Sequence, residues 1–119
     1  MKQKLISALE TLGYPVKLQG SLNSDEAYPD NFITFWCNDT DDKEHFDNEV
    51  TAWEWFFSVN FYSNNPTLVN TKPKEIIAVL KSAGFIPQGK GNDIPSDEPT
   101  HTGWAMEFIC TEENKLTKE

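Results

Sequence analysis

The stretch from Trp53 to Ser63 constrains the fold of this chain most strongly, because six of its eleven residues are aromatic. At a period of two, one of its faces is wholly apolar, as in a β-strand. That face comprises Trp53, Trp55, Phe57, Val59 and Phe61. Each buried aromatic side chain removes roughly 150–250 Å² from water. We therefore expect a strand inside a sheet, with Trp55, Phe57 and Phe61 in the core beneath helices.

The opposite face of the same strand is mixed, since Phe56 and Tyr62 alternate there with Glu54, Ser58 and Asn60. A fully solvated face does not need two aromatic residues, and an ordinary core does not hold this many polar ones. The pattern leaves two alternatives open. Either a thin second layer of the protein covers this face, or a partner protein does.

Other segments supply the remaining elements of the expected fold. Apolar spacings of three and four predict a helix in residues 1 to 12 and another from 66 to 83. Alternation or β-branched and aromatic content predicts three more strands, within residues 14–20, 32–37 and 102–110. The predicted class is α+β, a mainly antiparallel four-stranded sheet with two helices on one face, in the order α-β-β-β-α-β.

One domain is expected over residues 1–110, with a polar tail at 111–119. Pro73 within the second helix predicts either a kink or a division into a first turn and a main helix. Phe85 and Ile86 are expected to pack the end of that helix. The segment from Gln88 to Thr100 is rich in glycine and proline, and it is predicted to be a loop.

Composition excludes several classes of function. The chain has 119 residues, ten lysines, no arginine, nineteen carboxylates and a formal net charge of −9. Reading a nucleic-acid backbone needs clustered lysine and arginine, so sequence-specific nucleic-acid binding is not expected. No apolar run approaches the roughly 18 residues that cross a bilayer. We therefore expect no membrane association, and a protein that stays in the cytosol where it is made.

The connection from Asn38 to Glu49 is acidic and long for a hairpin. Its carboxylates are Asp39, Asp41, Asp42, Glu44, Asp47 and Glu49, with Lys43 as the only cation. A calcium-binding loop is not predicted, because Lys43 occupies a ligand position and the required central glycine is absent. Two interpretations remain. The segment is either a solvated surface that keeps the protein soluble, or a mobile contact loop for a partner.

No catalytic or metal-binding constellation is evident. Cys37 and Cys110 are scattered and are expected to be ordinary buried residues, with a disulfide as the less favoured interpretation. His45 and His101 are expected to be exposed or locally hydrogen-bonded, because no nucleophile lies in a recognised setting near either. We therefore predict a non-enzymatic protein that needs no metal, nucleotide or other cofactor.

Several motifs together resemble a family of small proteins of phages and prophages of Gram-positive bacteria, encoded among the genes for head–tail joining and tail termination. The motifs lie at residues 32–36, 59–63, 66–72 and 83–86, and above all in the segment GKGNDIPSDEPTHTG at 89–103. The resemblance covers about residues 1–110. This chain departs from the family at Trp104, where a basic residue is common, and at Pro73, where a helix former is common.

The resemblance implies a virion structural protein, a minor capsid or tail component. Several copies, with six as one candidate number, would form a ring that caps the tail tube protein and meets the head-connector protein. The expected location is the virion, and the host cytoplasm during assembly. The acidic residues from Asp39 to Glu49 named above, and Trp104, are then the candidate contacts with partners or with other copies.

A second class of function also suits a net charge of −9. A small acidic inhibitor can imitate DNA charge and block a nuclease or a restriction enzyme. Such an inhibitor should spread carboxylates along one elongated face as a monomer or dimer. A ring subunit should collect them at a loop or at an inner surface.

Overall fold

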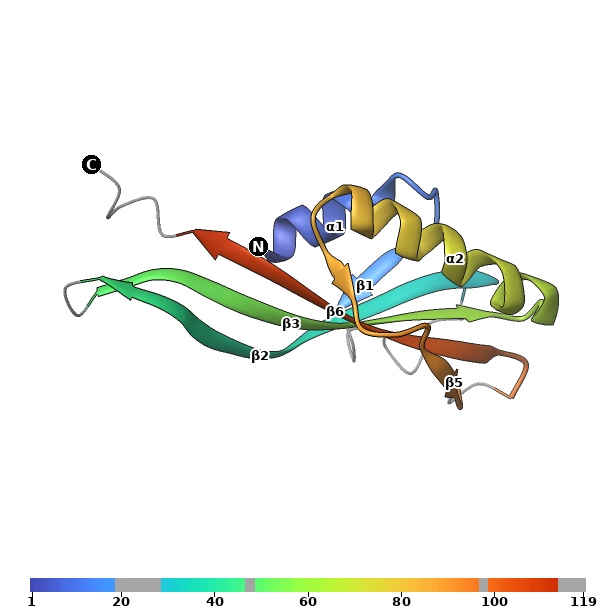
Figure 1. Ribbon diagram of the computed structural model, residues 1–119. Coiled ribbons are helices and arrows are strands. Elements are labelled where there is room, and N and C mark those ends of the chain that lie inside the picture. The colour runs from blue at the N-terminus through green and yellow to red at the C-terminus, as the bar shows by residue number, and fades with distance from the viewer. Residues whose placement is uncertain (19–28, 47–48, 97–98, 114–119) are drawn as a thin grey trace.

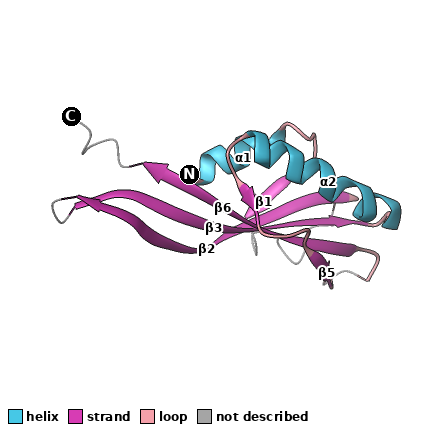
Figure 2. Ribbon diagram, viewed as in Figure 1, coloured by secondary structure: helices cyan, strands magenta, loops and turns pink. Residues whose placement is uncertain are grey.

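The computed structural model describes residues 1–18, 29–46, 49–96 and 99–113. It confirms the α+β class, with two helices and one sheet. The helices are α1 (Lys2–Glu10) and α2 (Pro66–Ser82). The strands are β1 (Val16–Leu18), β2 (Asn31–Phe46), β3 (Glu49–Ser63), β4 (Ile86–Pro87), β5 (Asn92–Ile94) and β6 (Thr102–Glu113). Both helices lie on the same face of the sheet (Figures 1 and 2).

The prediction of a mainly antiparallel four-stranded sheet was wrong in its detail. The sheet is mixed and six-stranded, in the order β1-β2-β3-β6-β4, with β5 also paired to β6. β1 pairs with β2 in parallel, whereas the other pairings are antiparallel. The two additional strands, β4 and β5, have two and three residues. β4 begins at Ile86, which was predicted to pack the helix end, and β5 lies within the segment predicted to be a loop. These strands are too short to show a periodic pattern in the sequence, and they form because each pairs with β6.

β2 is much longer than the strand predicted at residues 32–37. It continues to Phe46 and pairs with β3 as far as Phe46↔Glu49, with irregularities after Cys37 and around Glu44. Residues 38–46 are therefore strand, and the prediction of a loop there was wrong. β6 likewise continues to Glu113, three residues beyond the expected end of the domain. Residues 114–119 of the expected tail lie outside the described residues.

The core lies between the helices and one face of the sheet. Phe57 and Phe61 of β3 are fully buried in it, and Trp55 is partly buried against it. The helices contribute Leu5, Leu9, Val69, Ile76 and Leu80. Because the sheet residues alternate, the odd-numbered positions of β3 face the helices and the even-numbered positions face away.

α2 is a single helix from Pro66 to Ser82 with Pro73 inside it, so the alternative of two separate segments does not hold. The side chain of Asn65 caps its start by accepting a hydrogen bond from the Thr67 amide at 3.0 Å. At its end Gly84, with φ of 98°, reverses the chain, and the Phe85 amide donates to the Leu80 carbonyl at 2.9 Å. Phe85 is consequently buried, whereas Ile86 is 58% exposed, contrary to the prediction that both pack the helix end.

Candidate interaction surface

His101, the histidine whose side chain the structure describes, is held by hydrogen bonds and by packing. His101 is buried, its Nε2 lies 2.8 Å from the Pro29 carbonyl oxygen, and its Nδ1 lies 3.0 Å from the Thr100 hydroxyl. Its ring also contacts Phe32. Both ring nitrogens are engaged, which suits a residue that joins the start of β6 to the segment before β2. His45 lies in β2, and its side chain is outside the described residues.

Cys37 of β2 and Cys110 of β6 lie on strands that are separated by β3, and both are free thiols. Cys110 is buried, and this burial raises the pKa of its thiol. A raised pKa keeps the thiol protonated and a poor nucleophile at neutral pH. Within the described residues, no group of three or more His, Cys, Asp or Glu side chains is arranged to hold a metal ion.

A polar cluster sits on the face of the sheet away from the helices. The Ser58 hydroxyl lies 2.9 Å from each oxygen of the Glu107 carboxylate, and the Asn38 amide donates to Ser58 at 2.7 Å and to Glu107 at 2.8 Å. Three adjacent strands are thereby joined by side chains. Ser58 is almost fully buried. These bonds satisfy polar groups within the sheet.

The predicted acidic contacts lie on a long hairpin rather than on a loop. Four of them, Asp39, Asp41, Asp42 and Glu44, are in β2, and Glu49 begins β3. Asp47 lies outside the described residues. The hairpin extends past the helices, away from the rest of the body (Figure 1). Asp39 and Asp41 are exposed, and register places them opposite Phe56 and Glu54 on the helix-free face.

Among the described residues, the outer edge of β2 is unpaired along this hairpin. β1 pairs only with Ile33, Thr34 and Phe35, and no other described strand pairs with that edge. Exposed strand edges recruit other strands, and charged side chains oppose this. The exposed carboxylates of Asp39 and Asp41 therefore oppose the addition of another strand at this edge.

Trp104, the other predicted contact, lies on the helix-covered face. Its indole Nε1 donates to the Lys90 carbonyl at 2.8 Å. Gly91 makes this contact possible, since a Cβ at that position would lie 2.4 Å from the same indole nitrogen. Trp104 forms one wall of a groove of about 300 Å³ beside α2. The groove is lined by Val69, Asn70, Pro73, Lys74, Ile77, Lys90 and Trp104.

An apolar row that the sequence alone does not predict crosses the helix-free face of the sheet. Ile86 of β4 is the register partner of Ile109 of β6, which is in turn the partner of Phe56 of β3. Ile109 and Phe56 are partly exposed, and Ile86 is 58% exposed. No described helix or strand covers these three side chains. We call these three residues the apolar row. In the sequence, Phe56 stands out as an aromatic residue on a mixed strand face, but nothing indicates that Ile86 of β4 lies in line with it.

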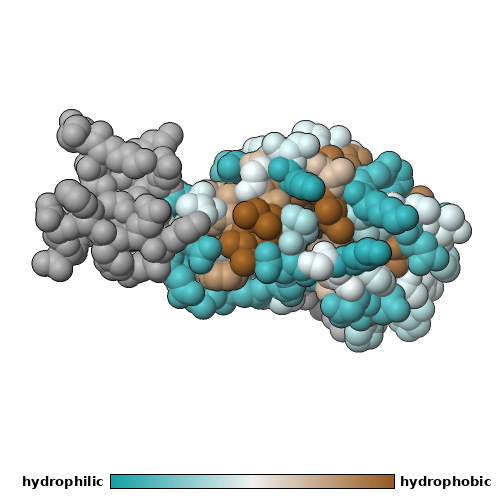
Figure 3. Space-filling view, viewed as in Figure 1, coloured by the Kyte–Doolittle hydropathy of each residue, from teal (hydrophilic) through white to brown (hydrophobic). Residues whose placement is uncertain are grey.

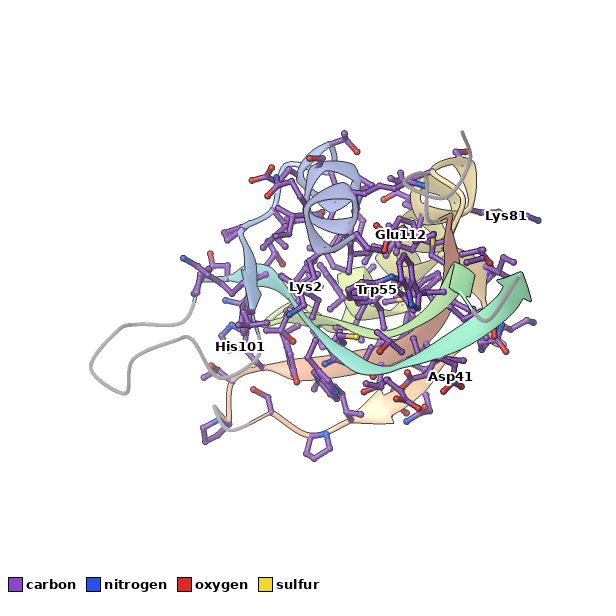
Figure 4. The ribbon with its side chains drawn as sticks, turned by 90° about the vertical axis from the view of Figure 1, so that its left-hand side faces the viewer. Lys2, Asp41, Trp55, Lys81, His101 and Glu112 are labelled. Carbon is purple, nitrogen blue, oxygen red and sulfur yellow. The ribbon has the colours of Figure 1, made fainter. Side chains whose placement is uncertain are left out.

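Charge is segregated between the two layers of the molecule. The helices carry five lysines against two glutamates. β2, β3 and β6 carry nine carboxylates against the single lysine Lys43. Figure 4 shows Lys81 with the helices and Asp41 on the far side of the sheet, while Trp55 and Glu112 point to the helix side. The Trp55 indole donates to the Glu112 carboxylate there at 2.9 Å.

Comparison with protein-family models and with curated protein sequences gives no match for this chain. None of the helices in the described part of the chain has the length and apolar character to span a membrane.

Proposed function

We propose that this protein is a non-enzymatic structural subunit of a phage virion, a tail terminator or head–tail joining protein that assembles into a ring on the tail tube. The observation that carries the proposal is the apolar row of Ile86, Ile109 and Phe56, three at least partly exposed side chains that no described helix or strand covers. Exposed apolar side chains grouped across strands are typical of surfaces that bind another protein. The resemblance of residues 1–110 to head–tail joining proteins supplies the kind of assembly.

The acidic strands support the same proposal. A ring at the head–tail junction surrounds the path of DNA, and carboxylates lining such a channel repel the phosphate backbone. The hairpin of β2 and β3 carries acidic residues beyond the helix-covered body, where they are available to line an opening (Figure 1). In this proposal the partners are further copies, the tail tube protein and the head-connector protein. No cofactor or membrane takes part.

A second candidate function is a DNA-mimic inhibitor of a nuclease or restriction enzyme. It is favoured by the hairpin of β2 and β3, which carries carboxylates at positions 39–44 and 49–54. At about 3.3 Å per residue these positions span roughly 20 Å. The distribution of the acids speaks against it. Glu112 bonds to Trp55 on the helix side, whereas Glu107 bonds to Ser58 on the other face. The carboxylates are therefore divided between two faces instead of following one.

Oligomeric state separates the two functions. The purified protein is examined by size-exclusion chromatography with light scattering at several concentrations, and the assembled fraction is imaged by negative-stain electron microscopy. Closed rings of uniform copy number are expected. A protein that stays monomeric or dimeric at every concentration, and that inhibits DNA cleavage by a nuclease, would replace the ring with the inhibitor.

A further inference from the structure

The apolar row is bordered mainly by acidic residues. Ile86, Ile109 and Phe56 run across β4, β6 and β3 as successive register partners. On one side of the row lies Glu107, and on the other side lie Thr111 and Glu54, as the register of β3 and β6 requires. Asp39 and Asp41 of β2 are exposed at its β2 end. The surface is thus an apolar strip with carboxylates around it, and its partner should offer apolar contacts together with cations.

The groove beside α2 has the opposite character. Its walls are apolar, formed by Val69, Pro73, Ile77 and Trp104, and its lysines are Lys74 and Lys90. Both lysines are exposed. Hydrophobic side chains gather along α2 and near β4 on the face of the molecule shown in Figure 3, with hydrophilic ones around them. The groove is therefore an apolar surface with positive charge beside it, whereas the apolar row has negative charge beside it.

The two surfaces cannot meet within one subunit. The row belongs to the sheet face away from the helices, because Phe56 alternates with the buried Phe57. The groove belongs to the helix side, where Trp104 packs against the core. They are separated by the sheet itself. A contact between them needs a second copy of the chain.

We propose that the apolar row of one subunit docks on the α2 groove of a second copy, with Asp39 and Asp41 facing Lys74 and Lys90. This inference rests on the proposed ring and names the surfaces that build it. The contact is heterologous, since it joins two different patches, and it leaves one unused row and one unused groove until the last copy closes the ring. A two-fold dimer would instead place acidic row against acidic row, which like charges oppose.

The first test removes the apolar anchor. Ile86→Glu changes a side chain that is 58% exposed, so the fold should survive, and the concentration needed for assembly should rise at least about 30-fold, as for a central interface residue. Leu18→Glu is the matched control, because Leu18 is an exposed apolar residue of β1 outside both surfaces. Circular dichroism and melting temperature verify folding, and light scattering measures assembly. Equal assembly by both variants would overturn the proposal.

The second test uses charge. The double variant Lys74→Glu with Lys90→Glu has a negative row and a negative groove, so it should not assemble alone. The double variant Asp39→Lys with Asp41→Lys has a positive groove and a less acidic row, so it should also fail alone. Mixed in equal amounts, the acidic row of the first variant meets the lysines of the second variant's groove. The introduced lysines of the second variant's row meet the glutamates of the first variant's groove, and rings with alternating subunits should form. Lys81→Glu, which makes the same charge change as either lysine substitution alone but in the last turn of α2, should assemble like the unmodified protein.

The outcomes distinguish this inference from the proposed function. If the unmodified protein forms rings and neither the Ile86 nor the lysine variants weaken them, the ring stands and the docking of row on groove is wrong. If the mixture of the two charge variants fails to assemble while each is folded, the pairing of these charges is wrong. If the unmodified protein never assembles, the ring itself is wrong, and this interface with it.

Discussion

The two faces of β3 have the same backbone and the same neighbours, β2 and β6, yet they are packed in different ways. Toward the helices, Phe57, Val59 and Phe61 are fully buried in an apolar core. On the other face, Ser58 and Asn60 are equally inaccessible but are polar, and each bonds to a side chain of an adjacent strand. One apolar face is enough to hold the helices, and the polar side chains of the second face specify which strands are neighbours.

The largest effect should come from truncating the helix-facing side. Phe57→Ala removes a ring that stacks 5.8 Å from Trp55 and meets Phe85 edge-on at 6.0 Å, and it should lower the free energy of unfolding by about 3–5 kcal/mol. Phe56→Ala is the natural control, one residue away on the other face and partly exposed. In the Phe56→Ala variant, the free energy of unfolding of the monomer, measured with urea, should fall by roughly 1 kcal/mol. Similar losses for both variants would mean that the two faces are not packed differently.

A smaller effect is expected where the second face is tightest. A Cβ at Gly103 would lie 2.7 Å from the Tyr62 ring and 3.0 Å from Ile94, so Gly103→Ala should destabilise by about 1–3 kcal/mol through crowding. In a Tyr62→Leu background the same substitution should be less damaging. Chemical denaturation of the four proteins of this cycle measures the coupling. Additive losses of stability would show that the aromatic ring of Tyr62 does not crowd a side chain at position 103.

The polar cluster should contribute less than the crowded glycine. Ser58→Ala removes the hydroxyl between Asn38 and Glu107, but the direct bond of 2.8 Å between those two residues can persist. The expected loss is about 1 kcal/mol, the usual net value of a hydrogen bond. Thermal unfolding measures it, with Ser7→Ala on the exposed side of α1 as control. If Ser58→Ala loses more stability than Gly103→Ala, the hydrogen bonds of the polar cluster contribute more to this face than the close packing around Gly103.

The smallest effect on stability is expected from the acidic hairpin. Replacing the six carboxylates from Asp39 to Glu49 by Asn and Gln should change the free energy of unfolding by less than about 1 kcal/mol. Exposed charges, such as those of Asp39 and Asp41, contribute little to stability. Assembly and the joining of heads to tails should nevertheless be impaired. Mixing the variant with purified tails checks the second point. Normal joining would return these residues to a solubilising role.

The sequence predicted the helices, β3 and the core side of the sheet because these elements carry clear periodicity. It failed for residues 38–46, where Asp and Asn have low β propensity and the strand forms only because β3 pairs with it. The strands β4 and β5 are too short to have a pattern of their own. The apolar row was missed for the same reason, since Ile86 joins Ile109 and Phe56 only through register between distant segments.

The position of β6 in the sheet sets the order in which the chain can fold. β6 comes last in the sequence but pairs with β3 from Ala52↔Glu113 to Ser63↔Thr102, and it also holds β4 and β5. Contacts between such distant segments form slowly. Until they form, the aromatic strand has one unpaired edge during synthesis, when strand edges associate most readily with other chains. The neighbouring acidic residues of β2 would then lower the aggregation of the nascent chain while the last strand is still being made.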